Sequence, residues 1–568
     1  MPYASIHYPF ENSEHFQGGL FPADFIAEGL DQTRGWFYTL TVLGNKLFGV
    51  SPFKNCIVNG LVLAEDGKKM SKSLKNYPDP TIVIDNHGSD ALRLYLINSP
   101  VVRAETLRFK EAGVKEVVSK VLLPLWNSYR FFSEQAILFK KITGEDFVGD
   151  PSFGNKAFTN VMDRWVLADL QSMLRFIEEE MRGMFIAMIV YPVGKLTQVG
   201  YRLYTVVPRL LLVIENLTNW YIRFNRKRLK GQAGLGAEDT KEALNTLLLV
   251  LFTAVRALAP FTPFITEHIY GLLKPYLAAY LADAKDSRSV HFLPFPTVQE
   301  ELFDEVTERR VSAMQNVINL GRIAREKRNI SVKVPLLSMV VIADAQHLAD
   351  IESLEAYVKE ELNVRDLVLT SDETKYNIKL EARVDWPTLG KKLKKNVKVV
   401  KDALPKLTQD QLKEFVRDGK ILVEGIELVD TDLTILRVLP EDKAASKDKD
   451  GPEFEAAFSN DAIVLLDVAP HPELLNDGLA RDLVNRLQRM RKKAGLVPTD
   501  DVHMQYSVVA NPDEVEIDSL IATRQSLFET SLRGPLEPLT DGAKGATTLL
   551  EEEQAVGNLV LTLRLAKM

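Results

Sequence analysis

The chain has 568 residues, of which 46% are hydrophobic and 26% charged, and its formal net charge is −7. No apolar run reaches the ~18 residues of a membrane span, and the single cysteine, Cys56, excludes an internal disulfide or a multi-cysteine zinc site. We therefore expect a multidomain cytoplasmic protein with no membrane partner, no zinc and no structural metal, in which any nucleic-acid contact comes from local basic patches.

The first hundred residues alternate between strand and helix patterns. Ala23–Gly29 is a short apolar strand, and a helical spacing of apolar residues follows over 33–49. A second β-rich run covers Lys54–Leu63, and a second helix covers 89–99, with Ser89 or Asp90 as its expected N-cap and Pro100 as its stop. This alternation predicts a parallel α/β sheet whose ligands lie beyond the carboxyl ends of its strands.

Two polar clusters follow these predicted strands, at 28–34 and 67–73. The second belongs to the stretch "GLVLAEDGKKMSKSLKN", where an apolar run gives way to a lysine-rich loop. An ammonium about 4 Å from a phosphate oxygen gains ~4 kcal/mol of gross Coulomb energy at an effective dielectric near 20. Such a loop can therefore fold over an anionic substrate, although its composition alone is also typical of a solvated surface loop.

The order Lys69-Met70-Ser71-Lys72-Ser73 resembles the second signature of the class I aminoacyl-tRNA synthetases. The resemblance implies a mobile loop that stabilises the phosphates of ATP. By this match Lys72, followed by Lys69, is the expected catalytic lysine, and Met70, Ser71 and Ser73 complete the ATP-binding segment with Lys72. Mg²⁺ is expected to accompany ATP.

The segment "AEGLDQTRGWF" is similar to the adenylate site of isoleucyl-tRNA synthetases, especially the eukaryotic cytoplasmic type. Taken singly, Asp31 is more often a helix cap, Trp36 more often part of a helix core, and Glu28 more often a surface strand end. Together the residues fit the chemistry, with carboxylates for an ammonium and for ribose hydroxyls and an aromatic wall for an aliphatic side chain. The resemblance implies an aminoacyl-adenylate site formed by Glu28, Gly29, Asp31, Gln32 and Trp36.

The first signature of the same family, a His-Ile-Gly-His tetrad or a near variant, does not occur in the sequence. The opening "MPYASIHYPFEN" is similar to a segment inside the family's catalytic domain. We therefore expect a C-terminal portion of a longer enzyme, without the first half of the nucleotide fold and without the inserted editing domain.

From about Gly113 to Pro275 the pattern is helical and predicts an α-helical bundle. It resembles the anticodon-binding domain of the family, most closely in "NWYIRFNRKR" and "LAPFTPFITE". Trp220 and Tyr221 are expected in the bundle core. We interpret residues 182–200 as an unusual interpolation in this helical pattern. The candidates for tRNA phosphate contacts, which a solvated helix face explains equally well, are Arg223, Arg226, Lys227 and Arg228.

The remaining chain mixes helices and strands. "GKKLKKNVKVVKDALPKL" is a basic helical segment, and in "LARDLVNRLQRMRKK" the apolar positions share one helix face while the arginines lie off it. The fold class expected is multidomain α/β plus α, with part of a Rossmann-like catalytic domain, a helical anticodon-binding bundle and mixed α/β domains. The expected boundaries are 1–112, 113–288, 289–439, a linker at 440–454, and 455–568.

The family resemblance implies an isoleucine–tRNA ligase, which joins isoleucine to ATP and transfers it to tRNA(Ile). Docking into a multi-synthetase complex is a further expectation for the C-terminal module. Two alternatives stay open. One is a valine-specific sister enzyme, against which "DQTRGW" counts, and the other is a non-catalytic tRNA-binding or assembly protein derived from a synthetase.

Overall fold

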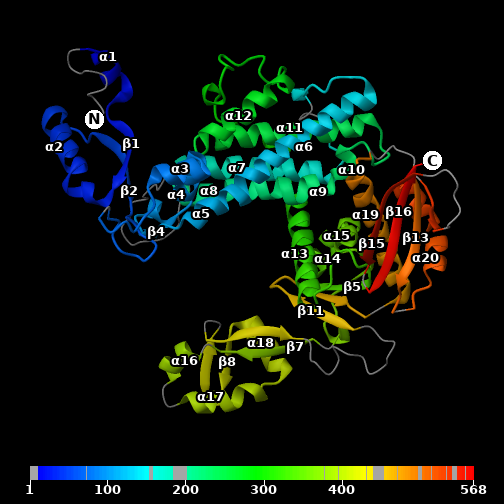
Figure 1. Ribbon diagram of the computed structural model, residues 1–568. Helices are drawn as coiled ribbons and strands as arrows, with labels where there is room; N and C mark the ends of the chain where they lie inside the picture. The colour runs from blue at the N-terminus through cyan, green and yellow to red at the C-terminus, as the bar shows by residue number, and fades with distance from the viewer. Residues whose placement is uncertain are drawn as a thin grey trace. The chain divides into compact units, whose positions relative to one another are not determined.

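The computed structural model forms two compact units, residues 1–308 and 309–568 (Figure 1). The structure describes residues 11–71, 73–152, 158–182, 201–376, 378–384, 386–393, 396–429, 432–438, 453–469, 471–496, 502–512, 514–532, 534–539, 547–556 and 558–567. Within these residues, no helix is long and apolar enough to cross a membrane. The expected segments 182–200 and 440–454 lie almost entirely outside the described residues.

A small parallel sheet opens the first unit. Strand β1 (Ala23–Gly29) pairs in parallel with β2 (Phe53–Asn59), and helix α2 (Trp36–Phe48) connects them. Ile26, Phe37 and Leu40 form the buried core between this strand and helix. The predicted strand–helix–strand order is therefore confirmed here.

The second predicted strand, Lys54–Leu63, is divided by Gly60 and is not one strand. β2 ends at Asn59, and β3 (Val62–Leu63) pairs in parallel with β4 (Leu107–Arg108) in a separate sheet. The Gly60 N–H donates to the carbonyl of Val101 at 2.7 Å, and a Cβ at Gly60 would lie 1.7 Å from the carbonyl oxygen of Glu105. This close backbone approach moves the chain from one sheet to the other.

The start of helix α4 (Ser89–Ile97) also differs from the sequence prediction. The pattern favours Ser89 or Asp90 as its N-cap, but the N-cap is Gly88 and no side chain caps the helix. The buried Asp90 carboxylate instead accepts the backbone N–H groups of Phe264 and Ile265, with 2.7 Å to Ile265. It thereby caps the first turn of α12 (Pro263–Leu273), whose free N–H groups need an acceptor.

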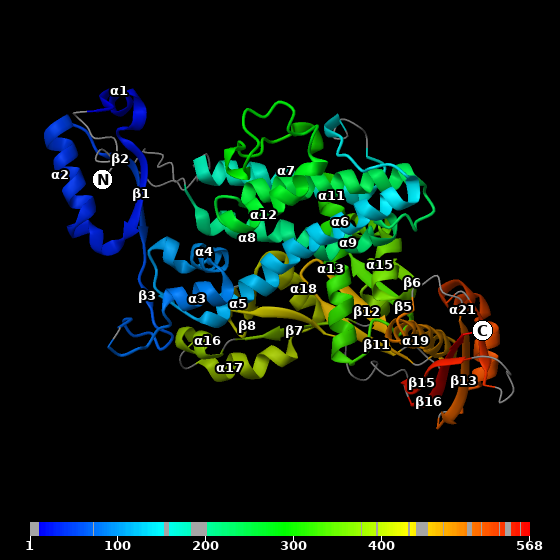
Figure 2. The same ribbon diagram turned by 45° about the horizontal axis from the view of Figure 1, so that its top comes forward.

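The predicted helical bundle is confirmed in its described part. Helices α6, α7, α8 and α11 lie side by side (Figures 1 and 2). Trp220 and Tyr221 are 6% and 0% exposed, as their expected core positions require. The bundle's elements are α5 (Glu111–Val117), η4 (Val118–Leu122), α6 (Leu123–Thr143), α7 (Val161–Arg182), α8 (Leu203–Glu215), η6 (Asn216–Tyr221), α9 (Ile222–Phe224), α10 (Arg226–Leu229), α11 (Ala237–Leu258) and α12.

A four-stranded mixed sheet lies at the start of the second unit, in the order β11-β12-β5-β6. β5 and β6 are parallel, and β12 is antiparallel to β5. Helix α13 (Glu305–Lys327) contains the division between the two units. The remaining elements are β5 (Leu336–Ala343), α14 (Ala345–Glu352), α15 (Glu355–Leu362), β6 (Val364–Thr370), β11 (Phe454–Phe458) and β12 (Ala462–Asp467).

A small module with its own apolar core follows β6 in the chain. β7 (Lys379–Arg383) pairs with β10 (Thr434–Val438), and β8 (Lys420–Val423) pairs with β9 (Ile426–Val429). Three helices accompany these strands and surround a core that includes Val400 and Leu428. They are α16 (Trp386–Leu393), α17 (Val397–Ala403) and α18 (Gln409–Asp418).

The last module packs helix α19 (Pro472–Lys493) on a sheet of order β14-β13-β16-β15. Leu483 and Leu487 are fully buried, so the predicted apolar face of this helix is confirmed. Arg491, expected off that face, is 6% exposed and donates to the carbonyl of Leu532. The strands are β13 (His503–Ala510), β14 (Leu536–Pro538), β15 (Thr547–Val556) and β16 (Leu559–Lys567).

Candidate functional site

The adenylate-site residues expected from the sequence lie on a short turn between β1 and α2. η2 (Leu30–Arg34) is a 3-10 helix bounded by Gly29 and Gly35. A Cβ at Gly29 would lie 2.8 Å from Asp31 Oδ1, and a Cβ at Gly35 would lie 2.7 Å from Gln32 Oε1. The two glycines therefore leave room for the side-chain oxygens of Asp31 and Gln32 to fold over the backbone.

Gln32 has a structural role that the sequence reading missed. Its Oε1 accepts the backbone N–H of Trp36 at 2.8 Å, which satisfies a free donor in the first turn of α2. Its carbonyl oxygen is thus engaged, and its amide N–H groups are the donors left for a ligand. Trp36 is half-buried and packs against the core beneath β1, while Glu28 and Asp31 are exposed.

The lysine-rich loop is built on a tight hairpin. Ala64 N donates to Lys68 O, Gly67 N donates to Ala64 O, both at 2.9 Å, and Leu63 bridges to Lys69. Gly67 has a φ of +81°, a conformation that a residue without Cβ adopts freely. The hairpin sets the position at which the signature segment begins, with Lys69 exposed to solvent.

Asn76, which follows the signature segment in the chain, makes two hydrogen bonds back to its backbone. Its Oδ1 accepts the backbone N–H of Ser71 at 2.9 Å, and its Nδ2 donates to the carbonyl of Lys69 at 3.1 Å. The hydroxyls of Ser71 and Ser73 are 2.8 Å apart. Sequence reasoning missed Asn76, although asparagine is a residue type that bonds nearby backbone and favours turns.

The structure places the two parts of the expected ATP and adenylate site on different sheets. Glu28–Trp36 follow β1, whereas the signature loop follows β3. Among the described residues, no hydrogen bond or ion pair joins these segments, and Lys72 lies outside the described residues. In the same part of the chain, no group of three or more His, Cys, Asp or Glu is placed so that it could hold a metal ion.

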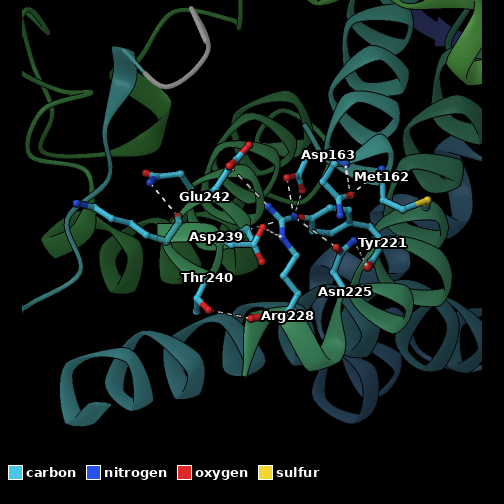
Figure 3. A network of polar contacts seen from close by, with 12 residues as sticks. Met162, Asp163, Tyr221, Asn225, Arg228, Asp239, Thr240 and Glu242 are labelled. Atoms are coloured by element: carbon cyan, nitrogen blue, oxygen red, sulfur yellow. Dashed lines mark hydrogen bonds and ion pairs between the residues drawn. The ribbon is translucent and has the colours of Figure 1, made fainter. Parts of the chain in front are cut away.

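The structure argues against Arg228 as a phosphate ligand. Arg228 is 4% exposed, and its guanidinium lies among carboxylates from two neighbouring helices (Figure 3). Nη1 donates to Asp163 Oδ2 and Nε to Asp239 Oδ1, both at 2.6 Å. The Tyr221 hydroxyl donates to the other Asp163 oxygen at 2.7 Å.

Within this network, charge and burial act in opposite directions on the pKa values of Asp163 and Arg228. Burial raises the pKa of Asp163, and the positive charge of Arg228 opposes that rise. Burial by itself would lower the pKa of Arg228, but the Asp163 charge and the hydrogen bonds raise it overall. Arg228 is therefore a permanently charged interior cation, and its function is to hold α10 against α7 and α11.

The other three basic candidates, Arg223, Arg226 and Lys227, are exposed. The Arg226 guanidinium lies 5.7 Å from the centre of the Phe131 ring, at a distance where a cation and an aromatic face attract. Both residues line a groove of about 430 Å³, together with Arg130 and Asn219. This groove combines cations, amides and an aromatic ring, which are the side chains that contact nucleic acid.

Comparison with known proteins finds two family-model matches in this chain. Residues 1–108 match the family model "tRNA synthetases class I (I, L, M and V)", and residues 195–341 match "Anticodon-binding domain of tRNA ligase". Among solved structures, methionyl-tRNA synthetase of Mycobacterium tuberculosis in complex with methionyl-adenylate matches 52% of this chain and 53% of its own, with 22% identity and a TM-score of 0.37.

Curated relatives match the whole chain much more closely. The cytoplasmic isoleucine–tRNA ligase of Saccharomyces cerevisiae is 52% identical over 100% of this chain and 50% of its own length. That of Mus musculus is 46% identical over 98% of this chain and 42% of its own length. The chain thus spans about half the length of the curated relatives it matches. The whole chain is therefore similar to about half of a cytoplasmic isoleucine–tRNA ligase, and its first 108 residues match the model of the class I tRNA synthetases.

Proposed function

We propose that the native protein is an isoleucine–tRNA ligase of the cytoplasm. The observation that carries the proposal is the 52% identity, over all of this chain, to a relative named as that enzyme. The lysine-rich signature and the glycine-bounded turn after β1 support it, because they supply phosphate-binding and adenylate-binding groups. Isoleucine, ATP with its Mg²⁺, and tRNA(Ile) are the proposed substrates.

The proposed reaction needs positioning and charge stabilisation rather than a nucleophilic side chain. A carboxylate oxygen of isoleucine attacks the α-phosphorus of ATP, and the bond from that phosphorus to the leaving pyrophosphate breaks. The terminal ribose hydroxyl of tRNA then attacks the isoleucyl carbonyl and displaces AMP. Lys69 and Lys72 would stabilise the phosphate charge, and Glu28 and Asp31 would hold the ammonium and ribose groups.

For tRNA, we propose the exposed part of the basic segment as a contact surface. Arg226 beside Phe131, with Arg130 across the same groove, would meet the phosphate backbone. Arg228 is not included, because its guanidinium is already paired in the interior. Docking of residues 455–568 into a multi-synthetase complex stays a prediction.

The test uses the native protein, captured from its source with an antibody against the C-terminal peptide "GNLVLTLRLAKM". Pyrophosphate exchange into ATP is measured with isoleucine and with valine at equal concentrations. Isoleucine-dependent exchange that greatly exceeds the valine rate supports the proposal. Faster exchange with valine would identify the sister enzyme instead, and tRNA binding without any exchange would identify a non-catalytic RNA-binding protein.

A further inference from the structure

The lysine-rich signature loop presents one serine to solvent in a turn. Ser73, Leu74 and Lys75 form this turn, and all three are exposed, with Leu74 at 67%. None of the three belongs to a helix or a strand. The segment can therefore enter the cleft of a modifying enzyme without the unfolding of a regular element, as exposed loop tips do in proteolysis.

The charge around Ser73 is positive on both sides along the chain. Lysines occupy positions 68, 69, 72 and 75, and no Asp or Glu occurs from 67 to 78. Lys68 forms an ion pair with Asp66 at 3.5 Å. Among the residues that the structure describes, the ammonium groups of Lys69 and Lys75 have no hydrogen-bond or ion-pair partner. These charges match an enzyme whose peptide-binding cleft is acidic.

The neighbouring serine supplies a hydrogen-bond donor for a phosphate on Ser73. The hydroxyl oxygens of Ser71 and Ser73 are 2.8 Å apart. Ser71 is less exposed, and its backbone N–H donates to Asn76 Oδ1 at 2.9 Å, so its place in the loop is fixed. Its O–H can donate to a phosphate oxygen, and lysine ammonium groups can add charge-assisted hydrogen bonds. Of the two serines, Ser73 is thus the better phosphoryl acceptor.

We propose that Ser73 is a phosphorylation site for a serine kinase with an acidic peptide-binding cleft. In the transfer, Ser73 Oγ attacks the γ-phosphorus of ATP bound to the kinase, and the bond from that phosphorus to the β–γ bridging oxygen breaks. ADP leaves, and the serine proton passes to the general base of the kinase. The resulting phosphoserine carries about −1.5 to −2 charges at pH 7.

The effect of this phosphate on the reaction rests on the proposed function. In that proposal, the signature lysines stabilise the phosphates of ATP. A phosphate on Ser73 would compete for the same ammonium groups and repel the ATP phosphates. Phosphorylation is therefore a reversible means of switching off the activation of isoleucine.

The first test measures phosphate transfer to the full chain. The catalytic fragment of protein kinase C serves as the kinase, because it accepts serines with basic residues on both sides. Endoproteinase Asp-N releases residues 66–78 as one peptide, and mass spectrometry locates the phosphate within it. We expect phosphate on Ser73, none in this peptide of Ser73→Ala, and continued transfer to Ser71→Ala.

A pair of charge variants tests recognition of the basic segment. Lys75→Glu should slow the transfer about tenfold, because it places a like charge against the acidic cleft. Lys115→Glu is the matched control, since Lys115 is exposed on α5, outside the loop. Equal rates for these two variants would overturn the proposal, as would phosphate on Ser71 alone or no phosphate in the peptide.

The second test uses the native protein. Isoleucine-dependent pyrophosphate exchange is measured before kinase treatment, after it, and after removal of the phosphate by a phosphatase. We expect a loss of about tenfold or more at full phosphorylation, with recovery after the phosphatase. In native protein carrying Ser73→Ala, treated and untreated samples should have equal rates.

Exchange that is unchanged by full phosphorylation of Ser73 would overturn the regulatory role. Absence of isoleucine-dependent exchange in the untreated native protein would instead refute the proposed function. Phosphate transfer to Ser73 of the full chain is scored without catalysis by this protein, so the two failures are distinguishable.

Discussion

Asp163 and Arg228 form a 2.6 Å ion pair inside the helical bundle, with side chains only 0% and 5% exposed. Asp163 lies on α7, and Arg228 lies on α10, a helix of four residues that is too short to be stable alone. The pair therefore fixes α10 in place. Because Arg226 and Lys227 belong to the same short helix, this buried contact also fixes the backbone from which they project toward solvent.

The first prediction concerns the cost of breaking this pair. Arg228→Leu leaves Asp163 buried without its cation, and the removal of one partner of a buried pair costs about 3–5 kcal/mol of unfolding free energy. Urea unfolding followed by tryptophan fluorescence measures the loss. Lys227→Ala, at the exposed neighbour, should change stability by no more than about 0.5 kcal/mol. Adding Asp163→Leu to Arg228→Leu should recover part of the loss, and a double variant no more stable than the single one would contradict this account.

The second prediction concerns the point at which the chain changes sheets. Gly60→Ala would place a Cβ 1.7 Å from the carbonyl oxygen of Glu105, which is backbone and cannot rotate away. We expect a loss of more than about 3 kcal/mol in unfolding free energy, because the β2 to β3 connection must shift. Gly271→Ala is the control, since a Cβ there has no neighbour within 4 Å and α12 favours alanine over glycine. A Gly60→Ala protein as stable as the control would refute the close-approach explanation.

Local sequence patterns predicted those features of the fold that depend on residues close together in the sequence. The strand Ala23–Gly29 follows from a short apolar run, and the burial of Leu483 and Leu487 follows from helical spacing. The basic segment made Arg228 a candidate phosphate contact, because a local pattern does not report a carboxylate 65 residues away. Gly60 was likewise predicted to lie within a strand. The local sequence does not show what requires a glycine there, which is the close approach of the Glu105 backbone.

The candidate site also contains residues that the sequence predicts and one that it does not. Residue types and order suggested Glu28, Asp31 and Lys69, and the turn geometry then explained why glycines occupy positions 29 and 35. Their roles toward ATP and isoleucine stay predictions. Asn76 was missed because its importance is geometric: it bonds the backbone of residues five and seven positions earlier.

The third prediction is a pH dependence in the second unit. Arg309 holds both oxygens of Asp350, with Nε to Oδ2 at 2.8 Å and Nη2 to Oδ1 at 3.0 Å. These hydrogen bonds lower the pKa of Asp350 below its usual value, against the effect of burial. A carboxylate whose folded-state pKa is lowered stabilises the protein above its unfolded-state pKa of about 3.9, and this contribution is lost as the pH falls through the folded-state value.

Unfolding free energies of the wild type and Asp350→Asn should therefore differ most near pH 6–7, and the difference should shrink below about pH 4. Asp410→Asn serves as the control, since Asp410 is exposed and, in the part of the chain that the structure describes, its carboxylate has no hydrogen-bond or ion-pair partner. Its effect on the free energy of unfolding should be small at every pH. A difference between wild type and Asp350→Asn that stays constant from pH 7 to pH 3 would show that the Arg309 contact does not hold the charged carboxylate.

The last prediction concerns Asn76 as a positioning residue for the lysine signature. Asn76→Ala removes two hydrogen bonds, to Ser71 N and Lys69 O, each of which contributes about 0.5–1.5 kcal/mol. Local opening of the loop should become about 5- to 150-fold more populated. Limited trypsin digestion, with mass spectrometry of the cut after Lys69, measures this opening without relying on catalysis.

Leu74→Ala is the matched control, because Leu74 lies in the same loop and its side chain is 67% exposed. Asn76→Asp should fall between the two, since a carboxylate still accepts from Ser71 N–H but no longer donates to the Lys69 carbonyl. If both Asn76 variants are cut after Lys69 at the control's rate, the two Asn76 hydrogen bonds do not restrain the loop. If they are cut faster while isoleucine-dependent exchange by equivalent variants of the native enzyme falls, then holding Lys69 and Ser71 in one geometry is part of how the signature reaches the phosphates.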